Sequence, residues 1–194
     1  MAPKAKVTRE EIVEAAVGLV REVGRDALNA RSLATRLGCS TQPIFSNFRS
    51  MQDLERAVIE EAERRYCLYT TEEIGSGKYP PYKASGMAYI RFAGDEPELF
   101  RLLFMRDRSE ETVTEHFALE HEIGEMVSEN TGLTGTEAQL FHLEMWAFVH
   151  GIATMVATSY LELDRELVSR MLTDCYQGIK AQHEEIKTQN EQKE

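Results

Sequence analysis

Cysteine is scarce in this sequence: Cys39, Cys67 and Cys175 are the only three among 194 residues. They are odd in number and widely spaced, and no two of them form a CxxC pair. A small secreted scaffold held by disulfides would need an even and denser set. The pattern is typical of free thiols in a reducing cytoplasm.

Long uncharged apolar runs and an apolar leader are also missing. No run reaches the roughly 20 apolar residues that a bilayer-crossing helix needs. The first residues, MAPKAKVTREE, lack the apolar core of a secretory signal. Hydrophobic residues nevertheless make up 42% of the chain, as in a globular protein. We therefore expect a globular, cytoplasmic protein with no membrane among its partners.

The common catalytic and metal-binding patterns are absent as well. The sequence holds no GxSxG, HExxH, CxxC or glycine-rich phosphate loop. His116 and His121 are five residues apart and diverge on a helix, so they make a poor metal pair, and His142 and His150 share a side only loosely. We expect no enzymatic activity, no metal and no cofactor. An enzyme remains one alternative, and a helical interaction module that binds no DNA is the other.

The charge is unevenly distributed along the chain. Its net value is −11, which by itself argues against a nucleic-acid partner. Residues 1–50, however, hold eight Lys and Arg against five Asp and Glu, a balance of +3. The remaining residues hold fourteen against twenty-eight, a balance of −14. A basic N-terminal part on an acidic body indicates an anionic partner for the N-terminal part alone.

Helical periodicity dominates the residues that are present. Thr8 to Glu11 has the pattern of a capping box, and apolar residues follow at three- and four-residue steps as far as Gly24. No strand pattern and no internal repeat is found, so the fold class is all-α. The further helices that we expect cover about residues 29–37, 40–48, 50–71, 82–93, 95–105, 112–130, 136–161 and 163–182. Asn29 would cap the first of these, and Gly94 would stop the helix at 82–93.

The predicted helices are shortest and follow one another most closely at residues 31–54, RSLATRLGCSTQPIFSNFRSMQDL. A short helix ends at Gly38, and a second short helix follows, capped by Ser40 and with Pro43 in its first turn. The apolar side of this second helix would be formed by Ile44, Phe45 and Phe48. Such a pair is a helix-turn-helix candidate, whose second helix enters the DNA major groove by its N-terminal residues. A three-helix packing unit that contacts only protein is the alternative.

Residues 8–54 resemble the DNA-binding domain of TetR-family transcriptional regulators. The matching features are the capped first helix, Leu33-Ala34…Leu37-Gly38, Ser40, Phe45…Phe48 and Ser50…Leu54. AYIRFAGDEPELFRLLF at 88–104 and WAFVHGIATM at 146–155 resemble the WHG-type C-terminal domain of some members, named for the triplet Trp146…His150-Gly151. The resemblance implies an N-terminal three-helix helix-turn-helix domain followed by a helical ligand-binding and dimerisation domain.

Thr41 and Gln42 are the residues that we expect to read bases. Glutamine can pair with adenine N6 and N7, and threonine can meet a thymine methyl group or another base edge. The alternative is that both are only exposed residues of the turn. Ser46 and Asn47 could reach either a base or a phosphate. The full set of DNA-contact candidates is Lys4, Lys6, Arg31, Ser40, Thr41, Gln42, Phe45, Ser46, Asn47 and Arg49; Arg36 is a further phosphate candidate.

Two positions depart from the family pattern. Phe45 lacks the hydroxyl of the tyrosine that the family usually has there, and Met51 lacks the charge of a frequent lysine. Both departures remove a potential phosphate contact, so DNA affinity would rest on other cations and on backbone N–H groups at helix starts.

The acidic body is expected to bind an effector and a second copy of the chain. Aromatic and methionine side chains could line an effector cavity, although each could instead be core, and His150 could be a buried structural donor. The pocket candidates are Tyr66, Tyr69, Tyr89, Phe92, Phe104, Phe117, His121, Met145, Trp146 and His150. The helix at 136–161 is apolar nearly all round, which predicts burial on several sides. The homodimer candidates are Ala147, Gly151, Thr154, Thr158, Val168, Met171, Leu172, Cys175 and Ile179.

These observations predict three parts of the chain. Residues 1–50 would form the helix-turn-helix DNA-binding domain, residues 51–182 the effector-binding and dimerisation domain, and residues 183–194 a frayed tail. The expected partners are double-stranded operator DNA, a second copy of the chain and an unidentified small-molecule effector. The function that follows is a ligand-responsive transcriptional regulator. Repression is the commoner mode in the family, and activation is the alternative.

Overall fold

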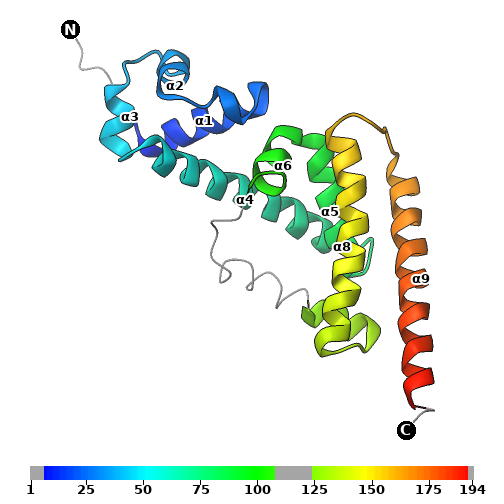
Figure 1. Ribbon diagram of the computed structural model, residues 1–194. Helices are drawn as coiled ribbons and strands as arrows, with labels where there is room; N and C mark the ends of the chain where they lie inside the picture. Colours follow the sequence, from blue (N-terminus) through cyan, green and yellow to red (C-terminus); the bar gives the residue numbers. More distant parts are fainter. Residues whose placement is uncertain (1–6, 108–123, 192–194) are drawn as a thin grey trace. The chain divides into compact units, whose positions relative to one another are not determined.

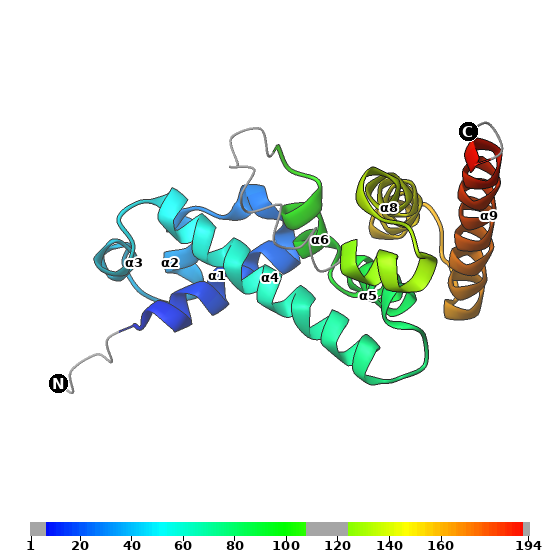
Figure 2. The same ribbon diagram turned by 90° about the horizontal axis from the view of Figure 1, so that it is seen from below.

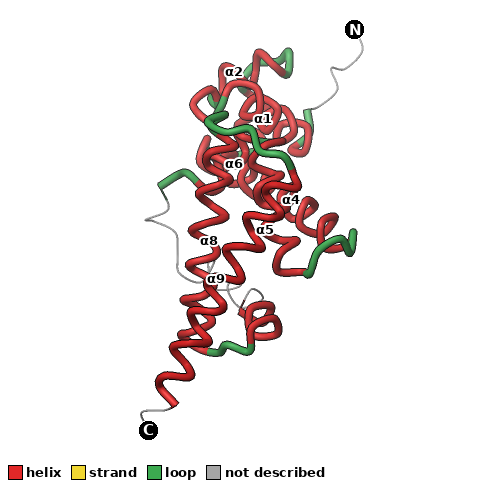
Figure 3. The backbone as a smooth tube through the Cα atoms, turned by 90° about the vertical axis from the view of Figure 1, so that its right-hand side faces the viewer, coloured by secondary structure: helices red, strands yellow, loops and turns green. Residues whose placement is uncertain are grey.

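The structure of the protein is a computed structural model that describes residues 7–107 and 124–191, with side chains as far as Glu185 in the second range. Within these ranges the chain consists of helices and connecting turns and contains no strand (Figures 1 and 3). The predicted all-α fold is therefore confirmed. The expected helix at 112–130 lies mostly outside the described residues; its last part, 124–131, is helical.

The chain divides into two compact units. The first comprises Met1–Leu68 with Asp95–Arg106, and the second comprises Tyr69–Gly94 with Asp107–Glu194. The division falls inside the long helix α4 (Met51–Gly75), which continues from one unit into the other (Figure 2). The functional boundary that we place after residue 50 stays a prediction.

The first unit surrounds one apolar core. Its elements are α1 (Arg9–Val23), η1 (Arg25–Ala27), α2 (Ala30–Arg36), α3 (Gln42–Asn47), the first part of α4 and α6 (Pro97–Phe104). Each helix turns an apolar stripe inward, because side chains three and four residues apart share a helix face. The most completely buried side chains of this core are Ile12, Val17, Leu33, Ile44, Phe48, Leu54, Leu99 and Phe100.

Hydrogen bonds to capping side chains fix where α1 and α2 begin. The Thr8 hydroxyl accepts the Glu11 N–H, and the Glu11 carboxylate accepts the Thr8 N–H, so the predicted capping box is confirmed. Asn29 caps α2 by accepting the N–H groups of Arg31 and Ser32. At the end of α2, Gly38 has φ +63°, and the Cys39 N–H bonds to the Ala34 carbonyl. That closure favours glycine and starts the turn toward α3.

Three details of the first unit differ from expectation. Ser40 does not cap α3: the helix is preceded by Thr41, whose side chain makes no capping hydrogen bond. Phe45 was expected on the apolar side of α3, but it is 50% exposed while Ile44 and Phe48 are buried. Val23 is 66% exposed, because the inward stripe of α1 shifts to include Val17.

The second unit is built on α5 (Pro81–Asp95), α8 (Gly135–Ala157) and α9 (Arg165–Glu191), together with the end of α4 and residues 124–131. Helices α5 and α8 run in the same direction (Figure 1), with the Tyr82 hydroxyl 3.1 Å from His142 Nδ1 and the Tyr89 hydroxyl 2.9 Å from His150 Nδ1. The tyrosines are seven residues apart and the histidines eight, about two helical turns in each case. The sequence reading did not pair these residues.

Glycine allows close packing of α5 on its neighbours. A Cβ atom at Gly86 would lie 3.5 Å from methyl groups of Val149 and Leu172, and one at Gly94 would lie 3.2 Å from Val156. The expected helix end at Gly94 is wrong, since α5 continues to Asp95. Gly94 therefore serves a close approach of α8 rather than a helix stop.

The last two helices depart from their predicted bounds. Helix α8 ends at Ala157 instead of Leu161, and Ser159, with φ +55°, lies in the turn that follows. Helix α9 continues to Glu191, nine residues beyond the expected end at Gln182. The tail was expected to have little to bury, yet His183 is only 5% exposed. An interaction with α8, described below, explains this burial.

Helix α8 is not buried on all sides. Leu140, Leu143 and Trp146 are 44%, 57% and 44% exposed, whereas Phe141 and Ile152 are buried. Contrary to expectation, α8 is also long and apolar enough to cross a membrane by length and composition. Core helices of soluble proteins can pass the same test, so the informative feature of α8 is its uncovered apolar face.

Candidate nucleic-acid interface

Helix α3 is held against the start of α1. Its apolar side inserts Ile44 and Phe48 into the core, and the Arg9 guanidinium lies 4.2 Å from the centre of the Phe48 ring. Arg9 also donates to the Asn47 carbonyl, while the Asn47 amide donates to the carbonyls of Val7 and Pro43. Arg9 was missed in the sequence reading, because its role depends on a contact with residues 47 and 48.

The opposite side of α3 is uncovered. Thr41, Gln42 and Phe45 are exposed at the first turn and just after it. Ser46 is also exposed, but its hydroxyl donates to the Gln42 carbonyl at 2.9 Å. Asn47 is partly buried by the contacts just described. Thr41 and Gln42 are thus the predicted base-reading residues whose side chains make the fewest contacts within the described structure. The side chains of Ser46 and Asn47 already form hydrogen bonds that stabilise α3 and its packing on α1.

The predicted phosphate contacts fall into three groups. Arg31 and Arg49 are exposed, and within the described part of the chain neither makes an ion pair. Arg36 forms two hydrogen bonds of 2.7 Å to the Glu22 carboxylate, which raise the pKa of Arg36 and lower that of Glu22. Arg36 therefore links α2 to α1, and its expected phosphate contact stays a prediction. Lys4 and Lys6 lie outside the described residues.

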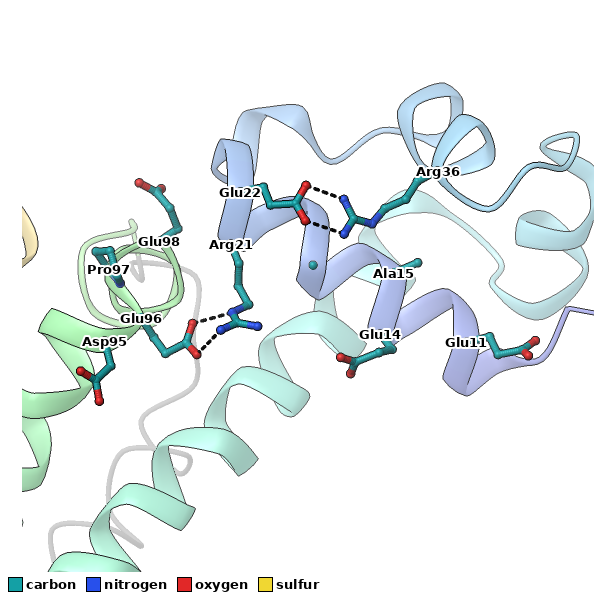
Figure 4. A pocket seen from close by; sticks show the side chains of 11 residues that line it. Glu11, Glu14, Ala15, Arg21, Glu22, Arg36, Asp95, Glu96, Pro97 and Glu98 are labelled. Carbon is teal, nitrogen blue, oxygen red and sulfur yellow. Dashed lines mark hydrogen bonds and ion pairs between the residues drawn. The ribbon is translucent and has the colours of Figure 1, made fainter.

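A depression of about 680 Å³ lies between α1, α2 and α6 within the first unit (Figure 4). Six carboxylates and two arginines are among its lining residues, which are Glu11, Glu14, Ala15, Gly18, Arg21, Glu22, Arg36, Asp95, Glu96, Pro97 and Glu98. Its volume is in the range of ligand sites, but such sites are mostly apolar. The charged lining makes it unlike the effector cavity that the aromatic residues predict.

Ion pairs cross this depression and connect its walls. Arg21 on α1 forms hydrogen bonds of 2.6 and 2.7 Å to the Glu96 carboxylate, next to the start of α6. The neighbouring Glu22 holds Arg36 on α2, and Figure 4 shows both pairs side by side along α1. The guanidinium of Arg36 lies against Gly18, where a Cβ atom would be 2.7 Å from a guanidinium nitrogen. Helix α6 is therefore linked through α1 to the helix-turn-helix.

The predicted aromatic pocket residues that the structure describes make ring contacts within each unit. Tyr66 meets Phe104 edge-on at 5.4 Å in the first unit, whereas Tyr69 meets Phe92 edge-on at 5.3 Å in the second. Met145 is 5% exposed and belongs to a core cluster with Val127, Ala138 and Phe141. The candidates Phe117 and His121 lie outside the described residues. The assignment of the remaining residues to an effector cavity stays a prediction.

His150 joins two other pocket candidates. Its ring stacks on Trp146 at 5.0 Å with an interplanar angle of 19°, and its Nδ1 faces the hydroxyl of buried Tyr89. Burial lowers the pKa of His150, which favours the neutral ring, and Nδ1 of a neutral ring can accept a hydrogen bond from the Tyr89 hydroxyl. In this contact His150 accepts a hydrogen bond, whereas the role considered for it was that of a buried donor, so its role stays a prediction. Burial also raises the pKa of Tyr82, the corresponding partner of His142.

The predicted dimer residues divide between surface and core. Ala147 and Thr158 are exposed, while Gly151, Thr154 and Met171 are half-buried, and a Cβ atom at Gly151 would meet no other atom within 4 Å. Val168 and Leu172 are each 3% exposed in the single chain, and Cys175 and Ile179 pack on the core cluster. Burial within the chain leaves Val168 and Leu172 little surface for a partner, while Cys175 and Ile179 are only partly buried. The exposed Leu140 and Leu143 of α8 were missed as dimer candidates, because an all-round apolar helix has no periodic signal for its outer side.

Known proteins resemble both parts of the chain. Residues 82–175 match the family of tetracyclin repressor-like C-terminal domains. An uncharacterized HTH-type transcriptional regulator of Mycobacterium tuberculosis is 28% identical over 167 residues, which are 84% of this chain and 76% of that protein. This sequence match extends well beyond the C-terminal domain, so the helix-turn-helix has a relative as well.

Solved structures share the arrangement of helices. A TetR-like transcriptional regulator from Rhodococcus sp. RHA1 has a TM-score of 0.67 at 15% identity, over 91% of this chain and 96% of that chain. The multidrug binding protein EbrR, complexed with imidazole, has a TM-score of 0.60 at 17% identity, over 86% and 88% of the two chains. At such identities the likeness shows the fold alone.

The chain has a helix-turn-helix in which the first turn of α3 is exposed, and a helical body that matches a regulator domain follows it. This combination defines a DNA-binding transcriptional regulator. Residues 82–175 match a family of regulator domains rather than enzymes, and the sequence relative is an HTH-type transcriptional regulator. This similarity to TetR-type regulators agrees with the resemblance found in the sequence.

Proposed function

We propose that the protein is a cytoplasmic transcriptional repressor that binds a pseudo-palindromic operator as a homodimer and leaves it when a small, largely apolar effector binds. The observation that carries the DNA-binding part is the uncovered first turn of α3. Thr41 and Gln42 are exposed there, on a helix whose other side is fixed by Ile44 and Phe48. A rigid helix with uncommitted polar side chains at its N-terminus is the arrangement that reads a major groove.

The homodimer is supported by the uncovered face of α8. Leu140 and Leu143 are 44% and 57% exposed, and Leu167 at the start of α9 is 43% exposed. Exposed leucines on helices that already pack on each other favour a second pair of helices, because burial of apolar surface stabilises association. Two-fold symmetry would then match a pseudo-palindromic operator with half-sites about one helical turn of DNA apart, or a multiple of it.

The effector part is supported by the aromatic content of the body and by one relative. EbrR is a multidrug binding protein, and the second unit of this chain holds Tyr69, Phe92, Tyr89 and Trp146 in ring contacts. An effector can shift the equilibrium only if it binds the released conformation more tightly than the DNA-bound one. Helix α4 is continuous between the units and follows α3 directly, so a tilt of α4 would move the reading helix.

The test is the electrophoretic mobility of labelled intergenic DNA from the gene's own locus. We expect a shift that unlabelled copies of the same DNA abolish and that unrelated DNA does not. Competition by both DNAs alike would contradict sequence-specific binding. Lack of any shift at low salt would favour the helical interaction module instead. A reporter gene placed behind the bound DNA then distinguishes repression from activation.

A further inference from the structure

His183 is a buried polar residue in a segment that has few apolar neighbours in sequence. It lies on α9 within the stretch HEEIKTQNE and is 5% exposed. Its Nδ1 lies 3.0 Å from a Glu137 carboxylate oxygen, and its Nε2 lies 3.1 Å from a Glu144 carboxylate oxygen. Glu137 and Glu144 are seven residues apart on α8, so the imidazole bridges two positions about two helical turns apart.

The two contacts define the protonation state of the ring. A neutral imidazole carries one N–H and can donate to only one carboxylate. Its other nitrogen would then turn a lone pair toward the second carboxylate, which is repulsive. Only the doubly protonated ring donates to Glu137 and Glu144 together. The geometry therefore favours an imidazolium between two carboxylates, and such charge-assisted hydrogen bonds are stronger than neutral ones.

Among the side chains that the structure describes, His183, Glu137 and Glu144 form no ion pair beyond these two. On α9, Lys180 lies 3.8 Å from Glu184, and Cys175 is close enough to Glu144 for that charge to help raise its pKa. On α8, the Phe141 ring lies edge-on to His183 at 5.8 Å. The side chains of Glu137 and Glu144 are 58% and 42% exposed, so protons in solution can reach the triad.

We propose that His183, Glu137 and Glu144 form a proton-dependent latch that fixes the C-terminal turns of α9 on α8 and opens as the pH rises. The apolar contacts of α9 with its own chain come from residues such as Val168, Leu172 and Ile179, all of which precede His183. In the part of α9 after Ile179, the described interaction with α8 is the pair of hydrogen bonds from His183 to Glu137 and Glu144. This inference concerns the packing of the two helices and does not rest on DNA or effector binding.

The direction of the pH effect follows from the pKa of His183. Burial lowers this pKa, but the hydrogen bonds and charges of Glu144 and Glu137 together raise it above the ordinary 6.5. A raised pKa in the folded chain means that the latch contributes its full stability below the ordinary value. That contribution is lost as the pH rises from 6.5 through the folded pKa.

Two substitutions separate the charge from the shape. His183→Lys keeps a positive charge at this position, and lysine does not titrate between about pH 6 and pH 9. In His183→Gln a polar side chain is kept without the charge. We expect the wild-type chain to lose protection from amide hydrogen exchange in residues 180–191 across this range, after correction for intrinsic exchange. His183→Lys should stay protected throughout, and His183→Gln should be unprotected at both ends of the range.

The direct measurement is the titration of the His183 ring in the wild-type protein by NMR, which needs no variant to fold. A midpoint above the ordinary histidine value supports the latch, and a midpoint at or below that value overturns it. Protection of residues 180–191 that does not change with pH in the wild type would also overturn it. Substitution of both carboxylates, Glu137→Gln with Glu144→Gln, should lower the His183 midpoint, because the two partner charges are removed.

Discussion

Gln42 is the residue whose assigned role can be tested most directly. It is exposed at the first position of α3, and its side chain makes no hydrogen bond in the described structure. We predict that Gln42→Ala relaxes base preference at one position in each half-site and costs roughly 1–3 kcal/mol for each bidentate pair lost. A binding-site selection profile measures this. An unchanged profile would mean that Gln42 does not read a base.

Arg49→Ala provides the matched control for this prediction. Arg49 is exposed and its backbone N–H is bonded to Asp53, so removal of the side chain leaves the start of α4 intact. Loss of a phosphate contact should weaken binding to all sequences alike and flatten the salt dependence. The two variants thus separate the reading of sequence from attraction to the DNA backbone.

Phe45 and Met51 allow a second test at the scale of single residues. Phe45 is 50% exposed, so a hydroxyl added there can reach solvent or a phosphate without disturbing the core. We predict that Phe45→Tyr combined with Met51→Lys tightens DNA binding and steepens the salt dependence by about one unit. Titrations with operator DNA at several salt concentrations measure the slope. A slope equal to that of the wild type would show that residue 51 does not approach the backbone.

At the scale of helices, α8 has two faces with different tasks. One face holds Phe141, Met145, Val149 and Ile152 in the interior. The other exposes leucines, and it includes Gly151, where an added Cβ atom would have no described side chain within 4 Å. A substitution at Gly151 can therefore act on association without crowding the folded chain.

We predict that Gly151→Leu weakens self-association while the thermal stability of the single chain is kept or rises slightly. Glycine in a helix interior costs about 1 kcal/mol relative to good helix formers, so leucine favours α8 itself. Sedimentation at a series of concentrations measures the dimer, and thermal unfolding under dissociating conditions measures the chain. A wild-type monomer at all concentrations would refute the proposed interface.

Gly86→Leu is the matched control on α5. A Cβ atom at Gly86 already contacts Val149 and Leu172 at 3.5 Å, so a larger side chain must displace them. Overpacking of this kind costs typically about 1–3 kcal/mol. We expect Gly86→Leu to lower the unfolding temperature of the chain, in contrast to Gly151→Leu. Equal loss of stability in both variants would place Gly151 in the core.

At the scale of the whole molecule, the proposed effector response needs communication along the chain. Helix α6 contributes to this, because Arg21 and Glu96 link it to α1, and Glu22 and Arg36 link α1 to α2. Phe104, the last residue of α6, contacts Tyr66 of α4. A change at Phe104 is therefore close to both helices that connect with the reading helix.

We predict that Phe104→Ala weakens the effector response and leaves ligand-free DNA binding intact. Apolar compounds can be screened by the fluorescence of Trp146, which is the only tryptophan in the chain and is stacked on His150. A compound that changes the emission should also lower operator affinity. Met145→Ala is the contrasting variant: Met145 is in the core cluster, so its truncation should cost about 2–5 kcal/mol of stability. If Phe104→Ala loses DNA binding as well, Phe104 serves the core.

Several features of this protein were determined by short stretches of sequence. The capping box at Thr8 and Glu11, the cap at Asn29 and the turn at Gly38 are local, and the structure has each of them. The helix-turn-helix and the all-α class follow from such signals together with helical periodicity. A cap or a turn involves residues within about four positions of each other, so neighbouring sequence is sufficient to specify it.

Other features were decided only by the tertiary structure. Periodicity shows that a helix has an apolar face, but the segment that covers this face comes from elsewhere in the chain. Gly94 was taken for a helix stop because its contact, Val156, is sixty-two residues away. Glu96 joins the first unit through Arg21, and His183 is buried by two glutamates that precede it by about forty residues. The sequence of α8 is apolar on nearly every side, so it does not show which side faces outward. The outer side is decided by where α5 and α9 pack, because they leave one side of α8 uncovered.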